Sequence, residues 1–121
     1  MIPEFHATVA EIGDRIALVS LSGELDLYEA QPLKDALATA DKLAPHAVVV
    51  DLSGVSFLDS TACGIFVAEA NRLRRADGRL VLVSNGNRAS RVLQVSGIDQ
   101  VVSVYETLHD AFGELLLEPI L

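Results

Sequence analysis

Hydrophobic and polar side chains alternate at the start of the chain, over residues 5–12. A period of two is typical of a strand with one buried face. Gly13 and Asp14 then indicate a turn, and a second apolar segment follows over residues 16–21. Two such segments separated by a short turn predict an antiparallel hairpin.

The spacing becomes helical after the second strand, which is expected to end within residues 22–26. Leu33, Leu37 and Ala40 recur at the spacing of one helical face. We therefore predict a helix over residues 28–43. Pro32 lies in its first turn, where a missing N–H has little effect, and Pro45 closes the helix.

The most continuous apolar segment, residues 47–52, predicts a central parallel strand that is buried on both faces. Ser53 and Gly54 then indicate a turn out of the strand. Phe57 and Leu58 are expected to return to the core before the next helix begins.

That next helix is predicted over residues 60–76, with Gly78 as its stop. Ser60 is the expected N-cap, because its hydroxyl can accept a hydrogen bond from an early helical N–H. The expected core face consists of Cys63, Phe66, Val67, Ala70 and Leu73. The opposite face carries Gly64, Ala68, Glu69, Arg72 and Arg75, with Ala62 and Ile65 between the two faces.

The remaining chain repeats the same alternation of elements. A strand is predicted over residues 79–84, a helix over 88–95, a short strand over 101–104 and a final helix over 106–117. The whole pattern predicts a single α/β domain over residues 1–121, with a mixed, mostly parallel sheet of about five strands and about four helices. The connections after the second strand should be right-handed crossovers.

Composition narrows the class of protein further. The chain has 9 Lys and Arg against 17 Asp and Glu, a net charge of −8 that argues against nucleic acid as a partner. The single cysteine, Cys63, cannot form an internal disulfide. The first residues lack a signal-peptide pattern, and no apolar run approaches the ~20 residues that span a bilayer. We expect a soluble, cytoplasmic protein that acts as a monomer.

Catalytic chemistry has little support in the sequence. Ser60 lacks the Gly-x-Ser-x-Gly elbow of a serine hydrolase, and the three histidines lie far from it in sequence. Cys63 falls on the predicted core face and is interpreted as a small core residue rather than a nucleophile. No nucleotide-binding glycine motif is present.

Three aspartates near strand ends, Asp26, Asp51 and Asp59, offer two further alternatives. Their spacing matches no metal-ligand motif, and local capping of turns is the favoured role of Asp51 and Asp59. Asp51 also ends a strand, as a phospho-acceptor aspartate would. The acidic pair and the lysine expected beside such an acceptor are absent from the corresponding strand ends. No metal or cofactor is expected.

Three segments resemble the STAS-domain anti-sigma-factor antagonists of bacteria. They are Gly-Glu-Leu-Asp at 23–26, Val-Val-Asp-Leu-Ser-Gly-Val-Ser-Phe-Leu-Asp-Ser-Thr at 49–61 and Ser-Gly-Ile-Asp at 96–99. The resemblance implies that Ser60, which follows Asp59, is phosphorylated by a partner kinase that is itself the anti-sigma factor. The family usually continues with Gly-Leu-Gly, whereas this chain has Ala-Cys-Gly at 62–64.

The resemblance implies a binding module rather than an enzyme. Unphosphorylated, it would bind an anti-sigma factor of the histidine-kinase-like ATPase type and release a sigma factor, and a PP2C-type phosphatase would reset it. The expected partner-binding residues are Glu24, Asp26, Asp59, Ser60, Thr61, Ile65, Glu69 and Arg72. The alternative is a STAS scaffold subunit of an ABC-type lipid-transport complex that is never phosphorylated.

Overall fold

The computed structural model describes residues 4–117, which form a five-stranded sheet in the order β1-β2-β3-β4-β5. β1 (His6–Ile12) pairs antiparallel with β2 (Ile16–Leu25), as the predicted hairpin requires. β3 (Ala47–Leu58), β4 (Arg79–Val83) and β5 (Ser103–Tyr105) continue the sheet in parallel. The predicted mixed, mostly parallel sheet is therefore confirmed.

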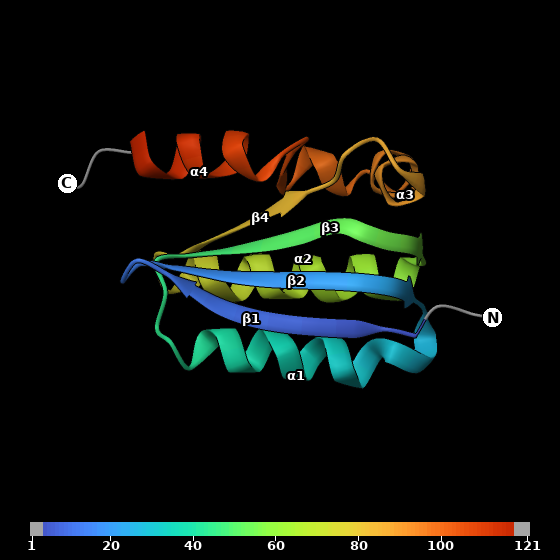
Figure 1. The fold of residues 1–121 in the computed structure, drawn as a ribbon, viewed down its shortest axis with the longest axis horizontal. Helices are drawn as coiled ribbons and strands as arrows, with labels where there is room; N and C mark the ends of the chain where they lie inside the picture. The colour runs from blue at the N-terminus through green and yellow to red at the C-terminus, as the bar shows by residue number, and fades with distance from the viewer. Residues whose placement is uncertain (1–3, 118–121) are drawn as a thin grey trace.

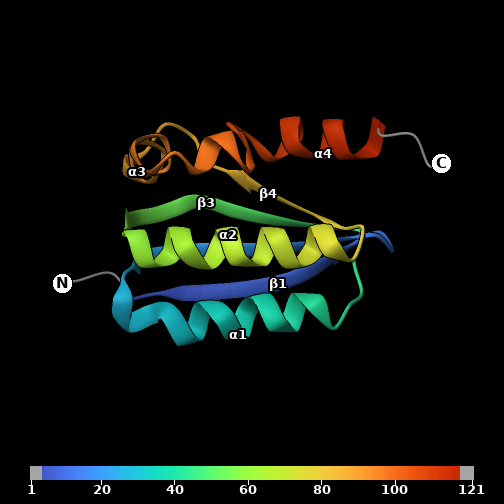
Figure 2. The same cartoon turned by 180° about the vertical axis from the view of Figure 1, so that it is seen from behind.

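The helices cover both faces of this sheet (Figures 1 and 2). α1 (Ala30–Asp41) and α2 (Ser60–Arg75) lie on one face, and α4 (Leu108–Leu117) lies on the other. α3 (Arg88–Ser96) sits at the end of the sheet where β3 finishes and α2 begins. The predicted first helix is shorter than expected, because the single turn η1 (Leu27–Glu29) precedes it; a second such turn, η2 (Ile98–Gln100), follows α3.

The two faces of the sheet build two hydrophobic clusters. Val48 and Val50 of β3 join the larger cluster under α1 and α2, to which Leu33 and Phe66 contribute. Val49 points the other way, toward a smaller cluster that includes Ala111 of α4. The continuous apolar run of β3 is thus buried on both faces, as predicted for a central parallel strand.

β3 does not turn away after Leu52 as the sequence analysis expected. It continues to Leu58, and its register with β2 shifts between Ser20 and Ser22 and again between Gly23 and Glu24. Each shift inserts one extra residue in β3, which is the signature of a bulge. The predicted turn at Ser53 and Gly54 is therefore wrong, because two bulges absorb the break in alternation within one strand.

The bulges also decide which side chains re-enter the core. Leu58 is buried at 2% exposure, but Phe57, which was expected beside it in the core, is 46% exposed. Gly54 permits the close approach of β2 at the first bulge, because a Cβ at this position would lie 2.9 Å from Cβ of Ser22. The second half of β3 pairs with β2 alone, since β4 ends opposite Asp51.

Candidate functional site

The carboxyl ends of β2 and β3 lie side by side and bring three acidic residues together. The N–H of Asp59 donates to the carbonyl of Leu25 over 3.3 Å, and Glu24 is the register partner of Phe57. Asp26 follows directly and its carboxylate accepts from the N–H of Tyr28 at 2.9 Å. Glu24, Asp26 and Asp59 therefore lie at the same end of the sheet, where α2 begins.

α2 is capped by Asp59, not by Ser60 as the sequence analysis predicted. Asp59 has extended backbone angles, and its Oδ1 accepts from the N–H of Ala62 at 3.1 Å. Either residue type makes a good cap, and the residue that remains extended after the buried Leu58 takes the role. Ser60 becomes the first helical residue, is exposed, and its hydroxyl makes no hydrogen bond within residues 4–117.

The neighbours of Ser60 along α2 are less accessible. Thr61 is half-buried, and Ala62 and Cys63 belong to the core, with exposures of 2% and 6%. Burial raises the pKa of the Cys63 thiol, against the lowering effect of a hydrogen bond with Ser96. A raised thiol pKa and a buried sulfur agree with the interpretation of Cys63 as a core residue. Val67, placed on the core face by the sequence, is only partly buried.

A groove, here called the α1 groove, separates α1 from α2. Its lining includes Lys34, Asp41, Thr61, Ile65, Glu69 and Arg72. Four of the eight expected partner-binding residues thus line this one groove. Ile65, expected between the two faces of α2, is half-buried and packs against the core.

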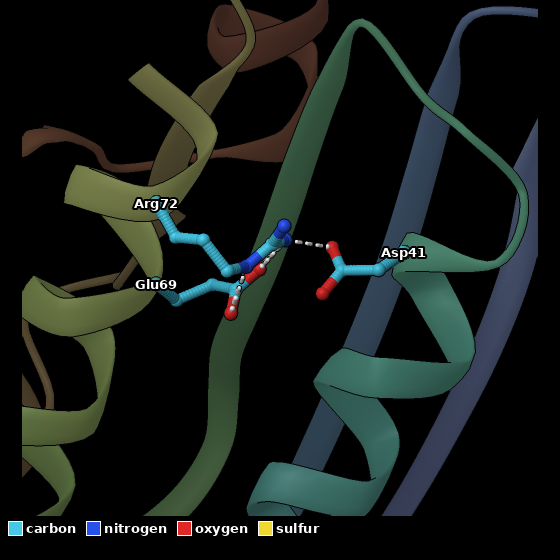
Figure 3. Close-up of polar contacts among 3 residues, drawn as sticks. All are labelled: Asp41, Glu69 and Arg72. Atoms are coloured by element: carbon cyan, nitrogen blue, oxygen red, sulfur yellow. Dashed lines mark hydrogen bonds and ion pairs between the residues drawn. The ribbon is translucent and has the colours of Figure 1, made fainter. Parts of the chain in front are cut away.

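The charges of the α1 groove are paired with one another. Arg72 Nη2 lies 2.6 Å from Asp41 Oδ1 and 2.5 Å from Glu69 Oε1 (Figure 3). The first contact is an ion pair and not a hydrogen bond. Asp41 Oδ1 is buried and accepts no hydrogen bond from the described residues. The second contact is a hydrogen-bonded pair within α2.

Crowding of two carboxylates perturbs this cluster. Burial and the adjacent Glu69 carboxylate raise the pKa of Asp41 from 3.8 to about 6, although Arg72 opposes the shift. The pKa of Arg72 rises in turn, first because of its hydrogen bond to Glu69. The cluster therefore links α1 to α2 through one guanidinium shared by two acids.

Asn87, which directly precedes α3, has no role assigned in the sequence analysis above. Its Nδ2 donates to the carbonyls of Leu52 at 3.1 Å and Val55 at 2.9 Å, on the side of β3 that β4 no longer covers. Its Oδ1 accepts from the N–H of Ser90 at 3.3 Å and so caps α3. One amide thus fixes α3 to the bulged half of β3.

The aspartates that suggested a metal or a phospho-acceptor have local roles. Asp51 Oδ1 accepts from the N–H of Ser53 at 2.9 Å, and Asp59 caps α2. The favoured interpretation of these two residues as local caps agrees with this geometry. Within residues 4–117, no group of three or more metal-ligating side chains converges.

No helix in the described part of the chain is long and apolar enough to cross a membrane.

Comparison with known proteins defines the class to which this fold and site belong. The family model for the STAS domain matches residues 7–111, so the chain belongs to the STAS domain family.

Two of the curated relatives are about one third identical to the chain over the aligned residues. It is 32% identical over 96 residues to the anti-sigma-F factor antagonist RsfB of Mycobacterium tuberculosis, covering 79% of this chain and 78% of that protein. It is also 32% identical over 88 residues to the anti-sigma-B factor antagonist of Staphylococcus epidermidis, covering 73% and 82%.

Solved structures agree in fold. An anti-sigma factor antagonist from Mycobacterium paratuberculosis superimposes with a TM-score of 0.83 at 32% identity, covering 92% of this chain and 93% of that one. Unphosphorylated SpoIIAA gives a TM-score of 0.77 at 20% identity, with 94% and 99% covered, which is a likeness of fold alone.

Proposed function

We propose that this protein is an anti-sigma-factor antagonist, a binding module without catalysis of its own that is switched by phosphorylation of Ser60. The observation that carries the proposal is the exposed Ser60 hydroxyl, which no cap engages, at the start of α2. It occurs in a chain 32% identical to proteins named as anti-sigma factor antagonists. The proposed partner is an anti-sigma factor of the histidine-kinase-like ATPase type.

The proposed chemistry belongs to the partner. Ser60 Oγ attacks the γ-phosphorus of ATP, the Oγ–P bond forms, and the bond to the bridging oxygen breaks as ADP leaves. The hydroxyl proton passes to a base of the kinase. A PP2C-type phosphatase would return the serine by hydrolysis. Thr61 is a poorer acceptor because it is half-buried.

Charge supplies the switch in this proposal. Phosphorylation adds about −1.5 to −2 of charge beside Glu24, Asp26 and Asp59. Against a partner carboxylate ~5 Å away, an effective dielectric constant of ~20 gives roughly 3 kcal/mol of repulsion per charge pair. Since about 2.7 kcal/mol is a hundredfold in affinity, dissociation requires no refolding.

The proposed partner surface is centred on Glu24, Asp26, Asp59, Ser60 and Thr61. The remaining expected residues form its periphery; they are Ile65, Glu69 and Arg72. The internal pairing of Arg72 with Asp41 and Glu69 favours a supporting role for these charges, because a partner would have to break that pairing to use them.

Phosphorylation and binding assays with candidate anti-sigma factors test the proposal. The protein and its Ser60→Ala variant are incubated with each kinase-type anti-sigma factor of the same genome and ATP, and the modified site is mapped by mass spectrometry. We expect phosphate on Ser60 alone and tight binding of Ser60→Ala in either nucleotide state. Phosphate on Thr61, or phosphorylation that persists in Ser60→Ala, would overturn the assignment of Ser60. Co-purification with an ABC-type ATPase and no kinase would favour the scaffold alternative.

A further inference from the structure

A second groove, here called the α3 groove, lies on the other side of the start of α2, between the end of β3 and α3. It has a volume of about 780 Å³, and its lining includes Phe57, Ser60, Arg88, Arg91, Val92 and Val95. Two of its apolar side chains are well exposed, Phe57 at 46% and Val95 at 80%. The candidate phosphorylation site therefore borders an open apolar surface.

The residues that α3 contributes form a single helical stripe. Arg88, Arg91, Val92 and Val95 stand at positions i, i+3, i+4 and i+7 of α3, which is the spacing of one helix face. The buried residues of α3, Ala89 and Leu93, belong to the core. The eight residues from Arg88 to Val95 extend about 10 Å along the helix, the length of roughly two turns of a partner helix.

The two arginines of this stripe are not used by the fold. Within residues 4–117, neither Arg88 nor Arg91 makes a hydrogen bond or an ion pair. Arg72, in contrast, is held by two acids. In a chain with a net charge of −8, two unpaired guanidinium groups beside an apolar surface are the complement of carboxylates on another molecule.

We propose that the α3 groove docks an amphipathic, acidic helix of the anti-sigma factor, with its apolar side chains on Phe57 and Val95 and its carboxylates on Arg88 and Arg91. This inference rests on the proposed function and adds the chemistry of the partner's contact. A stripe of two arginines followed by two valines along two helical turns suits a helix laid in a groove. Arginine and aromatic side chains also dominate the binding energy of many protein interfaces.

Phosphorylation of Ser60 would also act within the α3 groove. Ser60 lines the same groove as the arginines. A phosphoryl group there attracts Arg88 and Arg91 and repels the carboxylates that those arginines would otherwise bind. The phosphate and the partner helix therefore compete for the same two guanidinium groups.

Charge reversal in the groove tests the docking. The Arg88→Glu/Arg91→Glu and Val95→Asp variants are made in the Ser60→Ala background and titrated with the anti-sigma factor. We expect the affinity to fall about 30-fold or more for the double variant and about tenfold for Val95→Asp. The matched controls are Arg75→Glu, at the opposite end of α2, and Val101→Asp, which is also exposed at 56%. Both controls should bind within about twofold of the parent.

The outcomes separate the two proposals. If the parent binds and the groove variants bind as the controls do, the docking inference is overturned and the proposed function stands. If the parent binds no anti-sigma factor, the proposed function fails and the docking inference fails with it. Binding of the parent, but not of the double variant, to phosphatidylglycerol vesicles, with anti-sigma factor binding unaltered, would assign the groove to lipid and overturn the inference. The thermal midpoint of each variant is measured to detect misfolding. Arg91→Gln is added as a milder substitution that removes one charge of the groove.

The competition has a test that needs no partner. Phosphoserine is incorporated at position 60 by codon suppression, and the second ionisation of the phosphate is followed by ³¹P NMR. We expect the phosphate to lose its proton at a lower pH in the parent than in Arg88→Gln/Arg91→Gln, because the arginines stabilise the dianion. Arg75→Gln should titrate as the parent does. Identical titrations in all three proteins would overturn the competition.

Discussion

On one side of α2, Arg72 is held between Asp41 and Glu69; on the other, Arg88 and Arg91 face an apolar surface without an acid of their own. The α1 groove and the α3 groove are both lined by charged and apolar residues, and both border the start of α2. Their difference lies in whether the charges are satisfied within the fold. Paired charges hold helices together, whereas unpaired charges beside apolar side chains are available to another molecule. We therefore expect changes in the α1 groove to act mainly on stability and changes in the α3 groove mainly on binding.

Asn87→Ala should have the largest effect, because it removes the attachment of α3. Two carbonyls of β3 lose their donor, and α3 loses its cap. We expect the free energy of unfolding to fall by about 2–4 kcal/mol, measured by urea denaturation. Asn85→Ala is the matched control, since Asn85 is exposed and makes no hydrogen bond within the described chain. Equal stability of the two variants would mean that packing alone holds α3.

Arg72→Met should remove the ion pairs of the α1 groove and leave the α3 groove unchanged. Without the guanidinium, the Asp41 and Glu69 carboxylates face each other in a partly buried site. We expect a loss of about 2 kcal/mol of stability at pH 7.5, with a change of less than about threefold in anti-sigma factor affinity. Arg75→Met, an exposed arginine of the same helix, should change stability by less than about 0.5 kcal/mol. A larger effect on binding than on stability would reverse the roles assigned to the grooves.

Asp41→Asn should change the pH dependence of stability. The pKa of Asp41 is raised to about 6 in the folded chain, so its stabilising contribution is complete below pH 4 and is lost as the pH rises through 6. The variant lacks this loss. The free energy of unfolding of the variant, relative to wild type, should therefore rise by about 1–2 kcal/mol between pH 4 and pH 7.5. The effect is reduced by solvent screening, because the Asp41 side chain is 25% exposed. Parallel pH profiles would contradict the raised pKa.

Ile65→Glu should have the smallest effect, shared about equally between stability and binding. Ile65 is half-buried against the core and also lines the α1 groove near the proposed partner surface. We expect about 1 kcal/mol of lost stability and about 1 kcal/mol of weaker binding, by calorimetry and by titration with the anti-sigma factor. Arg75→Glu, at an exposed position of the same helix outside the α1 groove, is the control. Unfolding of Ile65→Glu would show that this side chain is core rather than periphery.

The sequence predicted the elements best where burial alone sets the pattern of apolar residues. The apolar run at 47–52 and the helical spacing of Phe66, Ala70 and Leu73 were interpreted correctly because burial alone enforces both patterns. The end of β3 was wrong because a bulge shifts the alternation by one residue, and such a shift looks like a turn. The cap of α2 was wrong by one residue, because Asp59 and Ser60 are both good caps.

The site residues beyond Ser60 depend on contacts that separation in sequence hides. Asp41 and Arg72 belong to different helices, and nothing in their local sequences indicates that they pair. Asn87 donates to carbonyls that lie 35 and 32 residues earlier in the chain, so its local sequence does not indicate these bonds. Arg88 and Arg91 can be assigned to a binding groove only because Phe57 is exposed beside them, and the sequence had placed Phe57 in the core.

The amide of Asn87 also has a consequence for how molecules of this protein meet one another. Beyond Asp51, β3 has lost β4 as a neighbour, so its outer carbonyls are those of an edge strand. Open edges recruit strands from other chains, which leads to strand exchange and aggregation. Asn87 occupies two of these acceptors with a side chain that offers no further strand to extend. We expect this single amide to limit self-association of the sheet where β3 loses β4 as a neighbour.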